Sequence, residues 1–229
     1  KDWCRDIRFG ASLIMLMAII FQHTGMISMI KKIILSLIIL QSCATAYDEI
    51  FVIVKNQALG YKEQPISADD LNEAKYSFMM LQIGRNPEIR LVLNTINNGV
   101  YEWVSADKYT ISTYNGLIVK STGLPHNITL RGFTGFHPNS KKRYTAILQF
   151  DEPSLMGALL ELQPGEYGEV QDTAIHTNLQ SYSYSRKVSS IGWKSNDIFW
   201  VDDKNLTVFS KQEIHPSIPP VKLRYFFKY

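Results

Sequence analysis

Hydrophobic and polar residues alternate along several short stretches between residue 76 and the C-terminus. The clearest stretches are 88–94, 143–150 and 221–228, and each places its hydrophobic residues on one face. A period of two is typical of a half-buried β-strand. Turn signals separate the stretches, at 85–87, 97–99, 115–116 and 202–205. The pattern predicts about ten short strands joined mainly by hairpins.

One of these turns carries a strong signal for a two-residue hairpin. Asn115-Gly116 lies between two β-rich segments, and both residue types tolerate a positive φ. The strands therefore predict a mainly β fold, a single antiparallel domain curled into a barrel or folded as a sandwich.

Two short helical segments are expected ahead of the strands. Hydrophobic residues fall at helical spacing over 47–58, and Gly60 is a plausible stop. A second helical turn is predicted over 67–74, with Ser67 as N-cap and acidic residues in the first turn. We expect the helix at 47–58 to pack across one opening or face of the β domain.

The segment before residue 43 has the parts of a secretory signal. Lys31 and Lys32 precede a short apolar run over 33–40, which is well below the about 20 residues that span a bilayer. Leu40-Gln41-Ser42-Cys43 resembles the bacterial lipobox. Signal cleavage is then expected between Ser42 and Cys43, and Cys43 is expected to carry a diacylglycerol and an N-acyl lipid such as palmitate. The alternative is a buried cysteine that follows a hydrophobic helix.

The use of cysteine supports lipid attachment. The chain has two cysteines, and Cys4 lies upstream of the signal, so a mature chain starting at Cys43 has no disulfide partner. Residues 1–28 hold a second apolar run at 11–21. We interpret 1–28 as an extension ahead of a true start at Met29 or Met26; the alternative is a longer membrane anchor. The expected division is an N-terminal extension with a signal peptide over 1–42 and one lipid-anchored β domain over 43–229.

The net positive charge of the chain comes from its export segment. Of 24 basic and 21 acidic residues, five basic and two acidic lie within 1–42, which leaves 19 of each. Binding to nucleic acid depends on a basic face that neutralises phosphates, so a nucleic-acid partner is not expected.

The sequence contains no recognisable catalytic motif. The histidines after Cys43 stand alone in the sequence and suggest no metal site: His126, His137, His176 and His215. No nucleophile elbow or phosphate loop is present. Adjacent acidic pairs at 69–70, 151–152 and 202–203 coincide with predicted turns or helix starts, and turn chemistry explains them. We therefore expect no enzymatic activity, no metal and no cofactor besides the lipid on Cys43.

Aromatic residues are abundant, at 12% of the chain. Trp103, Tyr182 and Tyr184 are candidates for stacking on sugar rings or contacting a partner. The alternative is that these rings form the core of the sheet and its cross-strand pairs.

Several segments of the chain are distinctive: Phe199-Trp200-Val201-Asp202, the stretch 208–212, Ile218-Pro219-Pro220-Val221, Tyr76-Ser77, Trp103 and Asn115-Gly116-Leu117. These segments resemble the YjbF/GfcB type of outer-membrane lipoprotein, which is associated with group 4 capsule and related exopolysaccharide loci. The middle of the chain, 138–190, matches only loosely, and Pro220 departs from the family pattern.

The resemblance implies a barrel-like periplasmic domain, held at the outer membrane by lipids on Cys43; Ala44, rather than Asp, fits outer-membrane sorting. It also implies a role in the export or assembly of a polysaccharide, beside a polysaccharide-export channel and companion periplasmic proteins. Two alternatives stay open. One is a lipid or lipoprotein carrier with an apolar groove beneath the helix at 47–58. The other is a glycan-binding or glycan-modifying protein, whose hydrolytic form needs two carboxylates facing one cleft.

Overall fold

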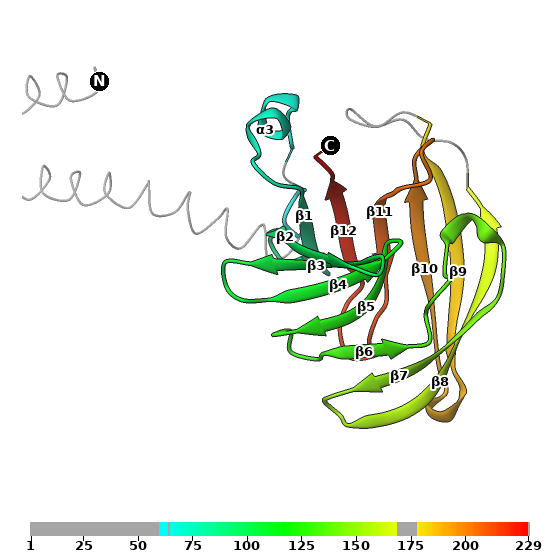
Figure 1. The fold of residues 1–229 in the computed structure, drawn as a ribbon. Helices are drawn as coiled ribbons and strands as arrows, with labels where there is room; N and C mark the ends of the chain where they lie inside the picture. Colours follow the sequence, from blue (N-terminus) through cyan, green and yellow to red (C-terminus); the bar gives the residue numbers. More distant parts are fainter. Residues whose placement is uncertain (1–59, 64, 169–177, 229) are drawn as a thin grey trace, which may run out of the picture. The chain divides into compact units, whose positions relative to one another are not determined.

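A computed structural model describes residues 60–63, 65–168 and 178–228 (Figure 1). The helix expected at 47–58, Ser42 and Cys43 lie outside these residues. The described part contains one short α-helix, α3 (Ala68–Glu73), and twelve strands. The strands are β1 (Phe78–Ile83), β2 (Ile89–Asn97), β3 (Val100–Ser105), β4 (Thr110–Tyr114), β5 (Leu117–Thr122), β6 (Ile128–Arg131), β7 (Tyr144–Phe150), β8 (Leu155–Tyr167), β9 (Gln180–Val188), β10 (Trp193–Val201), β11 (Thr207–Gln212) and β12 (Val221–Phe226).

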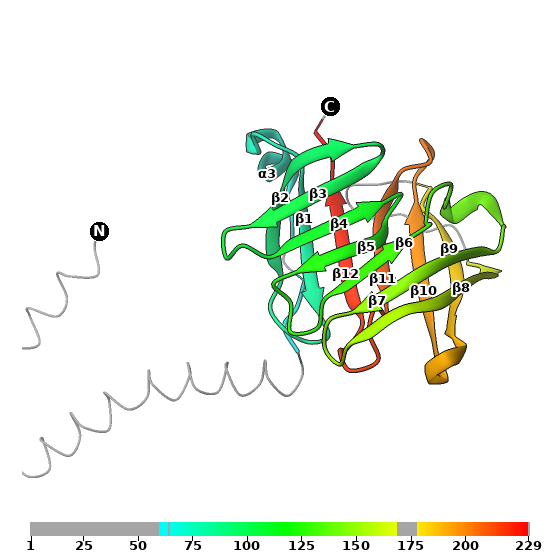
Figure 2. The ribbon, with the colours of Figure 1, turned by 60° about the horizontal axis from the view of Figure 1, so that its bottom comes forward.

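Each strand pairs antiparallel with the next one along the chain, and β12 pairs with β1 to close a barrel. Strands β3 to β7 run crosswise to β9 to β12 in both ribbon views (Figures 1 and 2). Closure pairs the strand edges that an open sheet would expose. The predicted mainly β fold with an antiparallel barrel is confirmed, with twelve strands in the described residues rather than about ten.

The predicted faces of the alternating stretches line the interior. Residues of 88–94, 143–150 and 221–228 that share the hydrophobic face all join one core cluster. These residues are Ile89, Leu91, Leu93, Tyr144, Ala146, Leu148, Phe150, Val221, Leu223, Tyr225 and Phe227. The period of two therefore identified the inner face of each strand correctly.

The hairpin turns use positive φ where the sequence predicts it. Asn98 and Gly99 link β2 to β3 with φ of 49° and 78°, and Asn115 and Gly116 link β4 to β5 with 48° and 83°. Positive φ at both central residues matches the twist of the flanking strands.

Helix α3 lies against the outside of the barrel at β1 and β12. Ser67 is its N-cap, as the sequence predicts, and it also forms a capping box with Asp70. These hydrogen bonds lower the pKa of the Asp70 carboxyl. Leu71 and Ala74 pack against a small outer cluster of Phe78, Met80 and Phe226. Among the described residues, no helix combines the length and hydrophobicity needed to cross a membrane.

Candidate functional site

The three aromatic residues proposed as glycan contacts occupy different environments. The side chain of Trp103 is 0% exposed and that of Tyr184 is 1% exposed, whereas Tyr182 is half-buried. Trp103 Nε1 donates to Thr113 Oγ1 at 3.0 Å, and the Tyr184 hydroxyl donates to the Pro138 carbonyl at 3.1 Å. The suggestion of a surface contact is thus corrected for Trp103 and Tyr184. Both rings point to the interior face of a curved sheet, where they form the core.

The β4–β5 hairpin folds into the barrel toward β11. Both ribbon views place its tip beside β11 (Figures 1 and 2). Thr207 Oγ1 donates to the Asn115 carbonyl at 3.0 Å. A Cβ added at Gly116 would lie 2.4 Å from Thr207 Cγ2, so only glycine fits this contact.

Gln212 holds the tip of this hairpin with both ends of its amide. Its Nε2 donates to the Gly116 carbonyl at 2.7 Å and to Ser210 Oγ at 2.9 Å, and its Oε1 accepts from the Ile118 N–H at 3.0 Å. The Tyr225 hydroxyl also donates to the Gly116 carbonyl, at 3.3 Å. Burial raises the pKa of Tyr225, which keeps this hydroxyl a donor. We call this set of interior residues the hairpin network: Trp103, Thr113, Gly116, Ser210, Gln212 and Tyr225.

A second polar cluster lies between β9 and β10. Arg186 and Asp197 form an ion pair at 2.6 Å with both side chains fully buried. Asp197 also accepts from the Glu213 N–H at 3.0 Å. Burial raises the pKa of the Asp197 carboxyl, and the Arg186 guanidinium opposes this shift. Ser195 lies beside Arg186 in the strand register, and we call these three residues the arginine cluster.

Two histidines stack where the β5–β6 and β11–β12 connections meet. The rings of His126 and His215 lie 4.6 Å apart with an angle of 5° between their planes. His215 Nδ1 accepts from the Ser217 N–H at 3.0 Å. Burial and the neighbouring His126 both lower the pKa of His215. The sequence showed these two histidines as isolated residues, because they are 89 positions apart.

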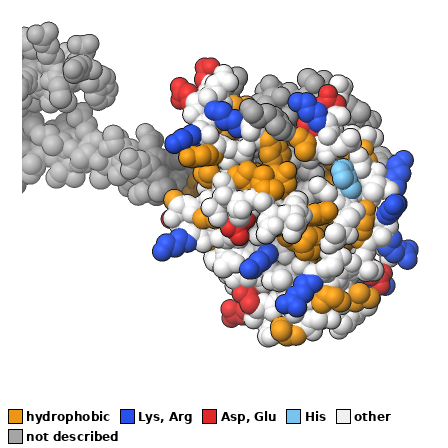
Figure 3. Space-filling model, in the orientation of Figure 1, with side chains coloured by type: hydrophobic (Ala, Val, Ile, Leu, Met, Phe, Trp, Pro, Cys, Tyr) orange, Lys and Arg blue, Asp and Glu red, His pale blue; other side chains and the backbone are white. Residues whose placement is uncertain are grey.

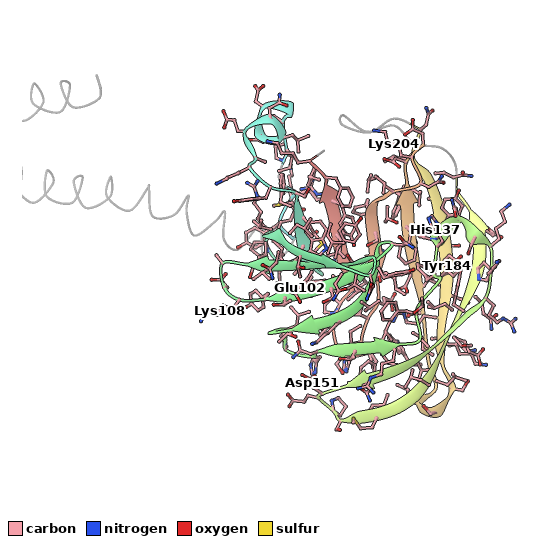
Figure 4. The ribbon with its side chains drawn as sticks, in the orientation of Figure 1. Glu102, Lys108, His137, Asp151, Tyr184 and Lys204 are labelled. Atoms are coloured by element: carbon pink, nitrogen blue, oxygen red, sulfur yellow. The ribbon has the colours of Figure 1, made fainter. Side chains whose placement is uncertain are left out.

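The acidic pairs have the turn roles that the sequence predicts. Asp70 caps α3, and Asp151 accepts from Asn127 through both carboxylate oxygens, at 2.7 Å each. Asp202 Oδ1 accepts from the N–H groups of Lys204 and Leu206 in the β10–β11 turn. Asp151 and Lys204 lie at opposite ends of the barrel (Figure 4). No group of three metal-ligating side chains occurs in the part of the chain that the structure describes.

Two grooves lie along the sheet. One, of about 500 Å³, is lined by residues of β2, β3 and β4, of the β2–β3 turn and of the loop after β6: Thr95, Asn97, Asn98, Val100, Glu102, Ser112, Tyr114, Phe133 and Thr134. The other, of about 440 Å³, is lined by residues of β8, β9 and β10: Gln163, Ser185, Arg186, Lys187, Lys194, Ser195 and Asn196. We call them the Tyr114 groove and the Lys187 groove. Their volumes lie within the range of about 300–1,000 Å³ that is usual for ligand sites.

The family model for the group 4 capsule polysaccharide lipoprotein GfcB, YjbF matches residues 47–226. This span covers most of the chain and includes all twelve strands. The chain belongs to the YjbF/GfcB family.

Two proteins to which the chain is similar are from Escherichia coli. The uncharacterized lipoprotein YjbF of strain K12 is 26% identical over 89 residues, a match covering 39% of this chain and 42% of that relative. The crystal structure of the hypothetical lipoprotein YmcC from strain K12 has a TM-score of 0.58 and 19% identity, and the match covers 73% of this chain and all of that one. At this identity, the second comparison supports the fold alone.

Three of the segments that carry the resemblance to the YjbF/GfcB family contribute residues to the hairpin network. Gln212, from the stretch 208–212, donates to the Gly116 carbonyl of the Asn115-Gly116 turn, and Trp103 donates to Thr113 on β4. Sequence reasoning noted these segments without assigning a role to Gln212. The signal available was a polar residue at an inward position of an otherwise alternating strand.

Proposed function

We propose that this YjbF/GfcB family member is a lipid-anchored lipoprotein of the outer membrane that faces the periplasm and assists the export or assembly of a capsular or extracellular polysaccharide. The observation that carries the proposal is the family match over 47–226, which begins four residues after Cys43, the last residue of the lipobox-like segment. The diacylglycerol and N-acyl lipid on Cys43 would tether the barrel to the membrane.

The proposal assigns the chain no catalytic reaction. The acidic side chains that could act as a catalytic pair are used in caps and turns at Asp70, Asp151 and Asp202. A hydrolase of glycans needs two carboxylates facing one cleft, and these three belong to separate turns. We propose a polysaccharide-export channel and companion periplasmic proteins as partners.

The test of this function is the amount of extracellular polysaccharide in three strains: a deletion of the gene, the deletion complemented with the wild-type chain, and the deletion complemented with Cys43→Ala. We expect polymer to fall in the deletion and to return only with the wild type. Recovery with Cys43→Ala would show that the barrel alone suffices and that the lipid is dispensable. Unchanged polymer in the deletion would contradict the proposed function.

The proposed location has a separate test. An Asp directly after the lipidated cysteine is associated with retention in the inner membrane in lipoproteins of enterobacterial type, and Ala44 occupies that position here. We expect the wild type to sediment with the outer membrane on a sucrose gradient and Ala44→Asp to sediment with the inner membrane. Co-sedimentation of both forms with the inner membrane would contradict the location.

A further inference from the structure

The Tyr114 groove combines two half-buried aromatic rings, which also pack against the core, with uncharged polar side chains of β2, β3, β4 and the adjoining loops. Tyr114 and Phe133 contribute rings whose centroids lie 5.3 Å apart. Asn97, Asn98 and Thr134 contribute exposed amide and hydroxyl groups. Glu102 is labelled on this layer in Figure 4, and Figure 3 shows the same view with side chains coloured by type.

The walls of the groove are held in place before any ligand binds. The Gly135 N–H donates to the Tyr114 hydroxyl at 3.4 Å, and Asn115 Nδ2 donates to the Phe136 carbonyl at 2.8 Å, so the loop after β6 is fastened to the β4–β5 hairpin. Gly99 also lies against Tyr114, since an added Cβ would be 3.1 Å from Cε2 of that ring. Preorganised walls reduce the entropy cost of binding.

The Glu102 carboxylate is also held in place by a hydrogen bond. Asn94 Nδ2 donates to Glu102 Oε1 at 2.8 Å, which fixes the direction of the carboxylate on β3. Among the lining residues of the groove, Glu102 is the one that carries a charge. A site with one fixed carboxylate and no lining cation repels anionic ligands.

We propose that the Tyr114 groove binds a segment of an uncharged polysaccharide. A sugar ring presents C–H groups on its faces and hydroxyl groups around its edge. The rings of Tyr114 and Phe133 suit the faces, whereas the amides of Asn97 and Asn98 and the Glu102 carboxylate suit the hydroxyl groups. The identity of the polymer rests on the proposed function, but the site is argued from its own side chains.

An extended peptide is a poorer occupant. Peptides that bind to sheets usually add a strand at an unpaired edge. The floor of this groove is made of β2, β3 and β4, whose backbones already pair with one another. Recognition here must therefore use side chains, and those present are hydrogen-bonding groups of the kind that hydroxyl-rich ligands need.

The test is equilibrium dialysis of the full chain, purified in detergent, against labelled oligosaccharides. The probe is a partial acid hydrolysate of the extracellular polysaccharide made by the strain that expresses the chain, divided by anion exchange into neutral and acidic fractions. We expect binding of the neutral fraction. Binding of the acidic fraction alone, or of neither fraction, would overturn the proposal.

Two variants assign binding to the groove. Glu102→Gln removes a charge-assisted acceptor and should weaken binding about fivefold. Phe133→Ala removes a ring face and should weaken it about tenfold. Glu161→Gln is the matched control for the first, because Glu161 also lies on a β-strand and accepts from a neighbouring amide, that of Gln163. Phe209→Ala, on strand β11 and outside the lining of the groove, is the control for the second.

The outcomes separate the site from the proposed function. Equal binding by the wild type, Glu102→Gln and Phe133→Ala would overturn the site, while the polysaccharide phenotype of the deletion strain would be unaffected. A deletion strain with normal polymer would instead contradict the function, and binding of the neutral fraction that is lost in the groove variants would still support the site. If only Phe133→Ala changes binding and also alters the circular dichroism spectrum, the near-isosteric Glu102→Gln decides, and its unchanged affinity overturns the proposal.

Discussion

The barrel buries two polar clusters, and they satisfy their side chains in different ways. In the hairpin network, the amide of Gln212 uses both of its ends, and the Trp103 N–H and the Tyr225 hydroxyl each have a partner. The arginine cluster holds a full charge on each side of its ion pair. Arg186 Nη1 and Ser195 Oγ are buried, and neither has a hydrogen-bond partner within the described residues.

The two clusters show two ways of burying polar side chains inside a barrel. Neutral hydrogen bonds depend on shape, because each donor must reach one acceptor at the correct distance. A buried ion pair depends on charge balance, because removing one charge leaves the other without compensation in a poorly solvated place. The hairpin network should therefore be sensitive to changes of shape and the arginine cluster to changes of charge.

The largest effect is expected for Asp197→Asn, which removes a charge with little change of shape. It should lower the free energy of unfolding by about 4 kcal/mol, because Arg186 is then a buried charge without a counter-ion. Urea unfolding measures the change. The matched control is Glu63→Gln in the exposed pair of Glu63 with Lys222, which should cost less than about 1 kcal/mol.

A double variant sharpens this test. Arg186→Met combined with Asp197→Leu removes both charges, and it should recover most of the stability that Asp197→Asn loses. Equal losses for the single and double variants would mean that packing, rather than charge balance, dominates this cluster.

The next effect is expected for Gly116→Ala. The new methyl group would meet the side chain of Thr207, and the φ of +83° is unfavourable for alanine. Together these should lower the free energy of unfolding by about 3 kcal/mol. Gly192→Ala is the control, because its φ is +66° and an added Cβ meets no atom within 4 Å. That variant should lose only about 1 kcal/mol, and an equal loss in both variants would contradict the close contact with Thr207.

Gln212→Leu tests the hairpin network by removing its central amide. The Ile118 N–H would then lose its acceptor inside the barrel, and the free energy of unfolding should fall by about 2 kcal/mol. Gln163→Leu, in a half-buried position on β8, serves as the control and should change stability by less than about 0.5 kcal/mol. A negligible loss for Gln212→Leu would show that neighbouring hydroxyl groups replace the amide.

The sequence predicted the local structure well, because strands and turns leave local signals. Alternation identified the inner faces of β2, β7 and β12, and Asn115-Gly116 identified a hairpin. What the sequence could not show is that the tip of this hairpin enters the barrel. That placement depends on Thr207 and Gln212, more than 90 positions away.

The candidate sites were less accessible to sequence reasoning. The same alternating pattern fits an aromatic residue in the core and one on the outer face, so Trp103 and Tyr184 could not be assigned to the interior before the curvature of the sheet was known. The Tyr114 groove was missed for a similar reason. Its residues come from three strands, the β2–β3 turn and the loop after β6, which only the fold brings together.

The smallest expected effect is a pH dependence of stability that arises from the stacked histidines. It extends the comparison of buried neutral groups with buried charges. Burial and His126 lower the pKa of His215, while the carboxylate of Asp151 favours the protonated form and opposes this shift. In the unfolded chain, His215 takes up a proton near its ordinary pKa of about 6.5. The unfolded state then binds more protons than the folded state, so the free energy of unfolding should fall as the pH drops from about 7.5 to about 5.5.

His215→Asn isolates this contribution, because asparagine does not titrate and its side-chain oxygen can take the place of Nδ1 as acceptor for the Ser217 N–H. We expect a shallower decrease of stability with falling pH in this variant, measured by urea unfolding at both pH values. Asp151 and the Glu152 carbonyl also interact with the two stacked histidines, and salt screens interactions between charges. The decrease of stability with pH should therefore be compared between the wild type and the variant at one salt concentration. Identical slopes for the wild type and His215→Asn would mean that His215 binds protons to the same extent in the folded and unfolded states, which would contradict its lowered pKa and leave the stack a packing role alone.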